Sequence, residues 1–217
     1  MTESEPRGPM RRYGGYAVLG IVVVAVAVLV VWLFAFGGDE GHQAAAPLQL
    51  DRPELLGTVG LETGVIDGHA PEVGKLAPDF ALANARDPER VVRLSDFRGT
   101  PVVLNWYASW CGPCKREIPD FQKAYEALDG EVVFLGVNLQ EDAAQAAGLL
   151  DVFVAKYPAL LDTEGEVAVH YRIPGMPTTF FIDADGIVRS MGAGLIVEEV
   201  LVEELARIGV IYEPEDP

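Results

Sequence analysis

Residues 101–118 read PVVLNWYASWCGPCKREI, and this stretch decides the fold. Pro101 to Trp106 is an apolar run of the kind that forms a central strand buried on both faces. Two cysteines follow it, and the chain from Gly112 to about Leu128 reads as a helix in which Pro119 predicts a kink. We therefore expect a pair of cysteines placed between a buried strand and the start of a helix.

These cysteines, Cys111 and Cys114, are the only two in the chain. A disulfide that closes so short a loop stabilises a fold by about 2 kcal/mol, against roughly 3 kcal/mol for a 15-residue loop. A zinc site needs about four ligands, and the three histidines have no ligand spacing to this pair: His42, His69 and His170. The pair therefore indicates redox exchange, and we expect neither a metal nor a cofactor.

The start of a helix gives the two thiols different chemistry. Free N–H groups and the helix dipole stabilise an anion there, so we expect Cys111 to be the exposed thiolate and the nucleophile. Cys114 lies about one turn further in and is expected to resolve a mixed disulfide. Pro113 fits the first helical turn, where its missing N–H is harmless.

The charge of the chain limits its partners. The 217 residues include 16 Lys and Arg against 33 Asp and Glu, a net charge of −17. Nucleic-acid binding needs clustered basic residues, so we expect no nucleic-acid partner. The acidity is spread along the chain, as on a well-solvated surface.

An uncharged segment near the N-terminus predicts a membrane anchor. Residues 16–36 span roughly 31 Å as a helix, close to the hydrocarbon thickness of a bilayer. Arginines precede the segment and acidic residues follow it, which predicts that 1–15 form a cytoplasmic tail and that the rest lies outside the cytoplasm. A cleaved signal peptide is one alternative, but its apolar part would be shorter. A buried core helix is another, but no polar face is visible.

The remaining chain divides into a linker over 37–73, a globular domain over 74–212 and a C-terminal tail over 213–217. The linker is rich in Gly, Ala and Pro. Within the domain, alternating buried strands and helices predict an α/β sandwich with a mixed central sheet. The expected strands are 79–82, 91–94, 101–106, 131–138, 159–161, 178–183 and 187–191; the expected helices are 112–128, 141–157, a short one ending near 171, and 197–208.

Three longer strings resemble one protein family. VGKLAPDFAL from Val73, VVLNWYASWCGPCKREIP and YRIPGMPTTFFIDADG resemble the TlpA/ResA-like membrane-anchored thiol–disulfide oxidoreductases of bacteria, which have a thioredoxin fold. The resemblance implies a cis peptide before Pro177, placed beside the dithiol. Such a bond would turn the Met176 backbone towards a substrate chain for strand-like pairing. An ordinary trans turn proline is the alternative.

The sequence departs from thioredoxins and from this family at two places. Cytoplasmic thioredoxins have a buried Asp at the position of Asn105, and we expect Asn105 to hydrogen-bond locally. Glu117, three residues after Cys114, matches an acidic residue that the ResA-like family keeps, and it is the candidate proton relay; a solvent-facing helix glutamate is the alternative. The second departure is Gly112-Pro113, which resembles reducing thioredoxins and tunes the redox potential.

Together these features predict a protein disulfide reductase at the bacterial cytoplasmic membrane, with its catalytic domain on the extracytoplasmic side. We expect Trp110 to cover the motif and, with Met176 and Pro177, to bind the substrate. The partners implied are a disulfide-containing protein (apocytochrome c is one candidate), a membrane electron donor, and the lipid bilayer. The alternatives are a disulfide-donating oxidase, a thiol peroxidase and a non-catalytic binding module.

Overall fold

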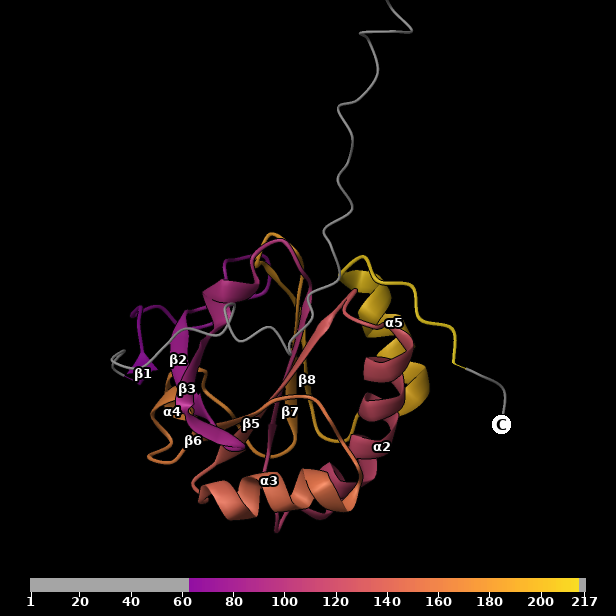
Figure 1. Ribbon diagram of the computed structural model, residues 1–217. Helices are drawn as coiled ribbons and strands as arrows, with labels where there is room; N and C mark the ends of the chain where they lie inside the picture. The colour runs from indigo at the N-terminus through magenta and orange to yellow at the C-terminus, as the bar shows by residue number, and fades with distance from the viewer. Residues whose placement is uncertain (1–62, 215–217) are drawn as a thin grey trace, which may run out of the picture. The chain divides into compact units, whose positions relative to one another are not determined.

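The structure is a computed structural model, and it describes residues 63–214 (Figure 1). The predicted anchor over 16–36 lies outside the described residues. Among those from 63 to 214, no helix is both long enough and apolar enough to cross a membrane.

Strands and helices alternate along most of the described chain. The strands are β1 (Gly64–Val65), β2 (Phe80–Asn84), β3 (Asp87–Arg93), β4 (Val102–Tyr107), β5 (Val133–Leu139), β6 (Ala159–Asp162), β7 (Thr178–Ile182) and β8 (Val188–Ala193). The helices are the 3-10 helix η2 (Leu94–Phe97) and the α-helices α2 (Gly112–Ala127), α3 (Ala143–Val152), α4 (Glu166–His170) and α5 (Glu198–Arg207).

The strands form one mixed sheet, as the sequence predicts. Its order is β1-β2-β6-β5-β4-β7-β8, with β3 paired to β2. Strand β4 is parallel to β5, which is parallel to β6, while β7 pairs antiparallel with β4 and with β8. All six residues of β4 are buried, so the strand that leads into the cysteine motif lies at the centre of the fold.

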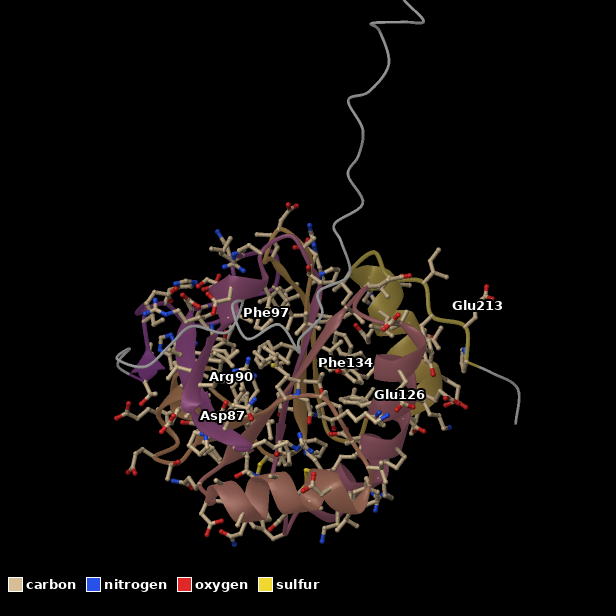
Figure 2. All side chains as sticks on the ribbon, viewed as in Figure 1. Asp87, Arg90, Phe97, Glu126, Phe134 and Glu213 are labelled. Atoms are coloured by element: carbon tan, nitrogen blue, oxygen red, sulfur yellow. A yellow bond between two sulfur atoms is a disulfide. The ribbon has the colours of Figure 1, made fainter. Side chains whose placement is uncertain are left out.

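The alternation of side chains along β4 divides the core into two layers. Val103 and Tyr107 face a cluster that includes buried residues of α2, α3 and α5. Trp106 faces the other cluster, to which η2 and α4 contribute. Figure 1 shows the helices on both faces of the sheet, and Figure 2 labels Phe134 and Phe97, which belong to the first and second cluster respectively. The sheet therefore holds the cysteine-bearing helix against one buried face.

The helix predicted over 141–157 is shorter than expected. It runs from Ala143 to Val152, with Asp142 as its N-cap. Val154 has a positive φ of 55°, and the N–H of Ala155 donates to the carbonyl of Leu150 at 2.8 Å. A left-handed residue of this kind closes a helix, so α3 ends well before Pro158. Placing the end of this helix at Pro158 was wrong.

Two further features lie near the ends of the sheet. Gly64 and Val65 of β1 pair with β2, although they belong to the stretch expected to be a linker. At the opposite edge, the predicted strands β7 and β8 pair as a hairpin, and Gly186 in its turn has the positive φ that a glycine adopts without strain. The sheet thus begins N-terminal to the predicted domain start at residue 74.

Candidate active site

The two cysteines lie where the sequence predicts them, at the first turn of α2. They form a disulfide with an S–S distance of 1.98 Å. Cys111 is the N-cap residue of the helix, and its Sγ accepts a hydrogen bond from the N–H of Cys114 at 3.2 Å. Pro113 occupies the first turn, and Pro119 lies inside the helix. The geometry therefore aims a helix N–H at the sulfur that is expected to carry negative charge.

Cys111 is less exposed than the sequence reasoning expects. In the disulfide form it is 4 % exposed, whereas Cys114 is fully buried at 0 %. The neighbouring Trp110 is 68 % exposed to solvent. In the disulfide form both cysteines are therefore buried, and the exposed Cys111 expected from the sequence is not seen. Trp106 is a core residue that packs against Tyr171 in a tilted arrangement, with ring centroids 4.9 Å apart.

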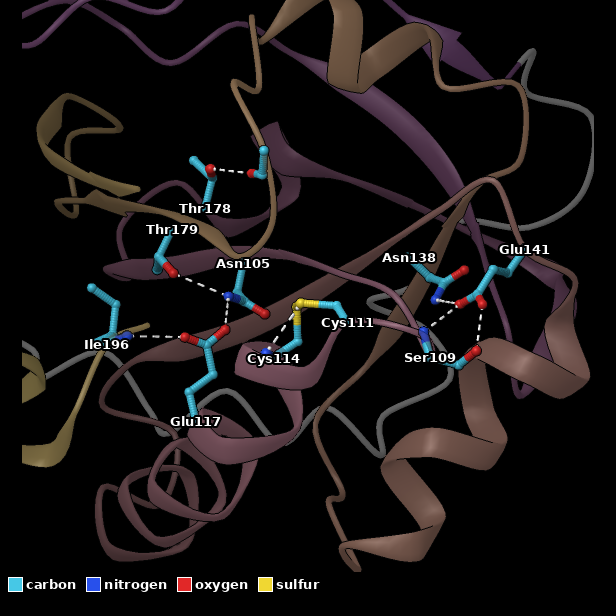
Figure 3. Close-up of a disulfide and its surroundings, with 11 residues drawn as sticks. Asn105, Ser109, Cys111, Cys114, Glu117, Asn138, Glu141, Thr178, Thr179 and Ile196 are labelled. Atoms are coloured by element: carbon cyan, nitrogen blue, oxygen red, sulfur yellow. Dashed lines mark hydrogen bonds between the residues drawn. A yellow bond between two sulfur atoms is a disulfide. The ribbon is translucent and has the colours of Figure 1, made fainter. Parts of the chain in front are cut away.

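Glu117 is completely buried on the helix that carries the dithiol. Its Oε1 accepts a hydrogen bond from Asn105 Nδ2 at 2.8 Å, and its Oε2 accepts one from the N–H of Ile196 at 3.1 Å (Figure 3). Burial raises the pKa of this carboxyl to about 7, although both hydrogen bonds act to lower it. The alternative of a solvent-facing glutamate is excluded by this burial.

Asn105 has different partners from those expected. Its Nδ2 donates to Glu117 and also to Thr179 Oγ1 at 3.0 Å, so it bridges β4, α2 and β7. The expectation of a local hydrogen bond was wrong, because its side chain points across the core towards elements that are distant in sequence. The amide that replaces a thioredoxin aspartate thus holds the glutamate on the neighbouring helix.

A second buried glutamate, Glu141, was not identified from the sequence. Its Oε2 accepts hydrogen bonds from the N–H of Ser109 at 2.7 Å and from Asn138 Nδ2 at 2.7 Å, and its Oε1 accepts one from Ser109 Oγ at 2.5 Å (Figure 3). Burial is the largest influence on its pKa and raises it, but the hydrogen bonds from Ser109 and Asn138 together hold the pKa below its usual value. Polar residues directly after a buried parallel strand were the signal that could have found it.

A groove opens beside Trp110. It has a volume of about 550 Å³ and extends from Trp110 past Val169 and Arg172 to Met176. The Met176–Pro177 peptide is cis, as the resemblance implies. Among residues 63–214, the backbone N–H and C=O of Met176 have no backbone hydrogen-bond partner, whereas Pro177 accepts one from Gly194. An extended chain lying in the groove would therefore find free backbone groups to pair with.

The described part of the chain offers no metal site. No group of three or more His, Cys, Asp or Glu side chains between residues 63 and 214 is placed to hold an ion. The chemistry that the arrangement supports is thiol–disulfide exchange, with Cys111 and Cys114 as the reacting sulfurs.

Comparisons with known proteins agree with this chemistry. Residues 73–191 match the AhpC/TSA family. The thiol-disulfide oxidoreductase ResA of Geobacillus kaustophilus is 34 % identical over 140 residues, which cover 64 % of this chain and 79 % of ResA. The thiol:disulfide interchange protein DsbE of Pseudomonas aeruginosa is 31 % identical over 146 residues, or 66 % of this chain and 79 % of DsbE.

A solved structure gives the same result for the fold. The crystal structure of StoA from Bacillus subtilis matches with a TM-score of 0.51 and 26 % identity, covering 62 % of this chain and 98 % of StoA. The chain therefore belongs to the AhpC/TSA family, and it is a thioredoxin-fold thiol–disulfide oxidoreductase of the ResA/DsbE type.

Proposed function

We propose that this oxidoreductase reduces disulfides of secreted or membrane-associated proteins on the extracytoplasmic side of the bacterial cytoplasmic membrane. The observation that carries the proposal is the Cys111–Cys114 pair at the start of α2, close to a buried carboxyl with a pKa of about 7. Gly112-Pro113 supports the reducing direction, because this dipeptide is similar to that of reducing thioredoxins.

The reaction begins with the reduced enzyme. The Cys111 thiolate attacks one sulfur of the substrate disulfide, a mixed disulfide forms, and the other substrate sulfur leaves as a thiolate that takes a proton. The N–H groups at the start of α2 stabilise the Cys111 thiolate before the attack.

Cys114 then resolves the mixed disulfide. Glu117 accepts the proton of the Cys114 thiol, directly or through one water, and the resulting thiolate attacks the Cys111 sulfur. The second substrate sulfur departs with the electron pair of the broken bond, and the enzyme is left with the disulfide seen in the structure. A carboxyl with a pKa of about 7 can accept this proton and later release it near neutral pH.

A second dithiol must return the enzyme to its reduced form. Two electrons and two protons are needed for each turnover, and the extracytoplasmic side has no glutathione buffer to supply them. A membrane protein with its own dithiol is therefore the electron donor in this proposal.

The substrate binds in the groove beside Trp110. Its occupant is the extended segment of the substrate protein that flanks the disulfide, because the groove is continuous with the residue preceding Cys111. The free backbone groups of Met176 pair with this segment as a short added strand. Apocytochrome c, which the family resemblance implies, is one protein whose paired cysteines would suit such a site.

The membrane location rests on the sequence of residues 16–36. The segment has no charged residue, is long enough to span a bilayer, and is preceded by arginines. A membrane-impermeant thiol reagent tests this location. Single cysteines are placed at residue 4 or residue 60 of a chain whose native cysteines are replaced by serine, and their labelling is measured. Labelling of residue 60 alone in intact cells is expected; labelling of residue 4 instead would contradict the proposed orientation.

Substrate trapping tests the enzymatic proposal. In the full-length chain, Cys114→Ser is expected to leave substrate proteins attached to Cys111 as mixed disulfides, which can be isolated from native membranes and identified. The double variant Cys111→Ser/Cys114→Ser is the matched control and should capture nothing. Captured proteins that appear equally in both variants, or a Cys111→Ser variant with full reductase activity, would overturn the mechanism.

The opposite direction, disulfide donation, is distinguished by the redox potential. A reductant of this fold is expected to have a potential of about −270 mV, and an oxidant one of about −120 mV. Equilibration of the chain with glutathione or dithiothreitol buffers, followed by alkylation of the free thiols, measures this value.

A further inference from the structure

A tight turn connects strand β4 to the cysteine motif. Strand β4 ends at Tyr107, and the N–H of Cys111 donates to the carbonyl of Ala108 at 3.1 Å. Ser109 and Trp110 are therefore the two central residues of a four-residue turn that directly precedes α2. The position of this turn fixes both the exposed indole of Trp110 and the sulfur of Cys111.

Glu141 ties this turn to the neighbouring strand. Both polar groups of Ser109, its N–H and its hydroxyl, donate to the Glu141 carboxylate. Asn138, at the end of β5, donates to the same carboxylate and lies directly opposite Tyr107 in the parallel register of β4 and β5. The ends of two adjacent strands are thus joined through one side chain (Figure 3).

Within the described part of the chain, these hydrogen bonds stabilise the negative charge of Glu141. Only 6 % of the residue is exposed, and no Lys, Arg or His among residues 63–214 forms an ion pair with it. The charged neighbour that acts on it is Asp142, whose effect is unfavourable to ionisation. A poorly hydrated carboxylate is tolerated only when donors satisfy its oxygens, and two of the three donors here belong to the turn.

We propose that Glu141 is a positioning residue for disulfide exchange: through Ser109 it fixes the turn that presents Trp110 and Cys111 to the substrate. It touches neither reacting sulfur, so its effect passes through the turn. This inference rests on the oxidoreductase activity of the chain and holds for either direction of electron transfer.

Two substitutions separate the geometry from the charge. In Glu141→Gln, the amide oxygen can accept from the N–H of Ser109 and from Asn138, while the amide N–H donates to Ser109 Oγ, whose hydroxyl can rotate to accept. Glu141→Ala removes all three hydrogen bonds. Both variants lack the negative charge, so a difference between them reports the hydrogen bonds. Glu131, an exposed glutamate before the opposite end of β5, provides the matched controls Glu131→Gln and Glu131→Ala.

The first readout is the reactivity of Cys111 in the reduced full-length chain. The rate of alkylation by iodoacetamide against pH gives the pKa of the Cys111 thiol when each variant also carries Cys114→Ser, because Cys111 is then the single cysteine of the chain. The thiol is expected to have a higher pKa in Glu141→Ala than in Glu141→Gln, because only the glutamine keeps the sulfur at the helix N-terminus. Equal pKa values in the two variants would overturn the proposal.

The second readout is kcat/KM with a protein disulfide. Glu141→Ala is expected to lose about tenfold or more, which is the order of one charge-assisted hydrogen bond, and Glu141→Gln to recover most of that loss. If Glu141→Ala does not fold, as judged by circular dichroism, Ser109→Ala takes its place, because it removes only the hydroxyl donor. Unchanged kinetics and an unchanged Cys111 pKa in Ser109→Ala would also overturn the proposal. Alkylation needs no substrate, so failure of the wild-type chain to reduce protein disulfides would contradict the proposed function without affecting this comparison.

Discussion

Glu117 and Glu141 flank the same disulfide, and their surroundings drive their pKa values in opposite directions (Figure 3). Glu117 lies inside α2, fully buried, with one amide and one backbone N–H as donors. Glu141 lies in the loop before α3, slightly exposed, with three donors from Ser109 and Asn138.

Burial alone therefore does not decide the charge of a carboxyl beside the dithiol. Each hydrogen bond to the ionised form offsets part of the lost hydration, and the outcome depends on how completely the two oxygens are satisfied. Glu117 is left with a pKa of about 7, suited to exchanging protons, whereas the lowered pKa of Glu141 keeps it a permanent anion and acceptor at neutral pH. One environment suits proton transfer and the other suits positioning.

The largest expected effect is on the turnover of Glu117→Gln. An amide cannot accept the proton of Cys114, so the resolving step at neutral pH is expected to slow by about 100-fold, within the usual range for a general base. The rise of the rate with pH near neutrality should disappear with it. Stopped-flow measurement of the decay of a mixed disulfide between pH 5 and 9 tests both statements.

The matched control for Glu117→Gln is Glu126→Gln. Glu126 lies on the same helix but is solvent-exposed and paired with Lys156. Its substitution should leave the resolving rate unchanged. If Glu117→Gln resolves the mixed disulfide within about threefold of the wild-type rate, the proton-transfer role of Glu117 is wrong and the two glutamates do not differ in function.

The next effect is on stability, and its sign differs between the two residues. The pKa of Glu117 is higher in the folded chain than in the unfolded one, so its stabilising contribution is complete below about pH 4.5 and is lost as the pH rises through about 7. The loss is on the order of 3 kcal/mol. The pKa of Glu141 is lower in the folded chain than in the unfolded one. Its stabilising contribution is therefore complete above the pKa that Glu141 has in the unfolded chain, and it is lost as the pH falls through the pKa that Glu141 has in the folded chain.

Denaturation of the oxidised chain by urea at a series of pH values measures this difference. Between about pH 4.5 and 7, the free energy of unfolding of the wild type is expected to fall relative to that of Glu117→Gln. Relative to Glu141→Gln, it should instead fall as the pH drops into the acidic range. Parallel pH dependence in both variants would show that the two carboxyls have the same environment.

The sequence predicts the surroundings of Glu117 much better than those of Glu141. The buried strand before the motif, the position of the cysteines at a helix start and the spacing from Cys114 to Glu117 are all local, so the first turn of α2 and its glutamate could be predicted. The cis peptide at Pro177 followed from the family resemblance.

The position of Glu141 just after a buried strand was a usable signal, but its hydrogen-bond partners could not be predicted because they depend on sheet register. Ser109 and Asn138 are brought together only when β4 and β5 pair in parallel with Tyr107 opposite Asn138. The interaction of Asn105 with Glu117 likewise crosses from the central strand to a helix. The early end of α3 depends on Val154 adopting a left-handed conformation, which is rare for a β-branched residue and has no warning in the sequence.

The smallest expected effect comes from the one amide donor that Glu117 has. Asn105→Ala removes a hydrogen bond that favours the ionised carboxyl, so the pKa of Glu117 should rise above about 7, by about one unit for a bond of ordinary strength to a charged group. The midpoint of the pH profile of the resolving step should move upward by the same amount. Thr179→Val is the control: it removes the other acceptor of Asn105 but leaves the bond to Glu117, so its midpoint should stay close to that of the wild type. A midpoint that moves equally in both variants would mean that cavity and packing changes set the pKa of Glu117. Movement in Asn105→Ala alone would instead show that the loss of a single donor raises the pKa of a buried glutamate. The number of donors would then explain why the pKa of Glu117 is raised while that of Glu141 is lowered.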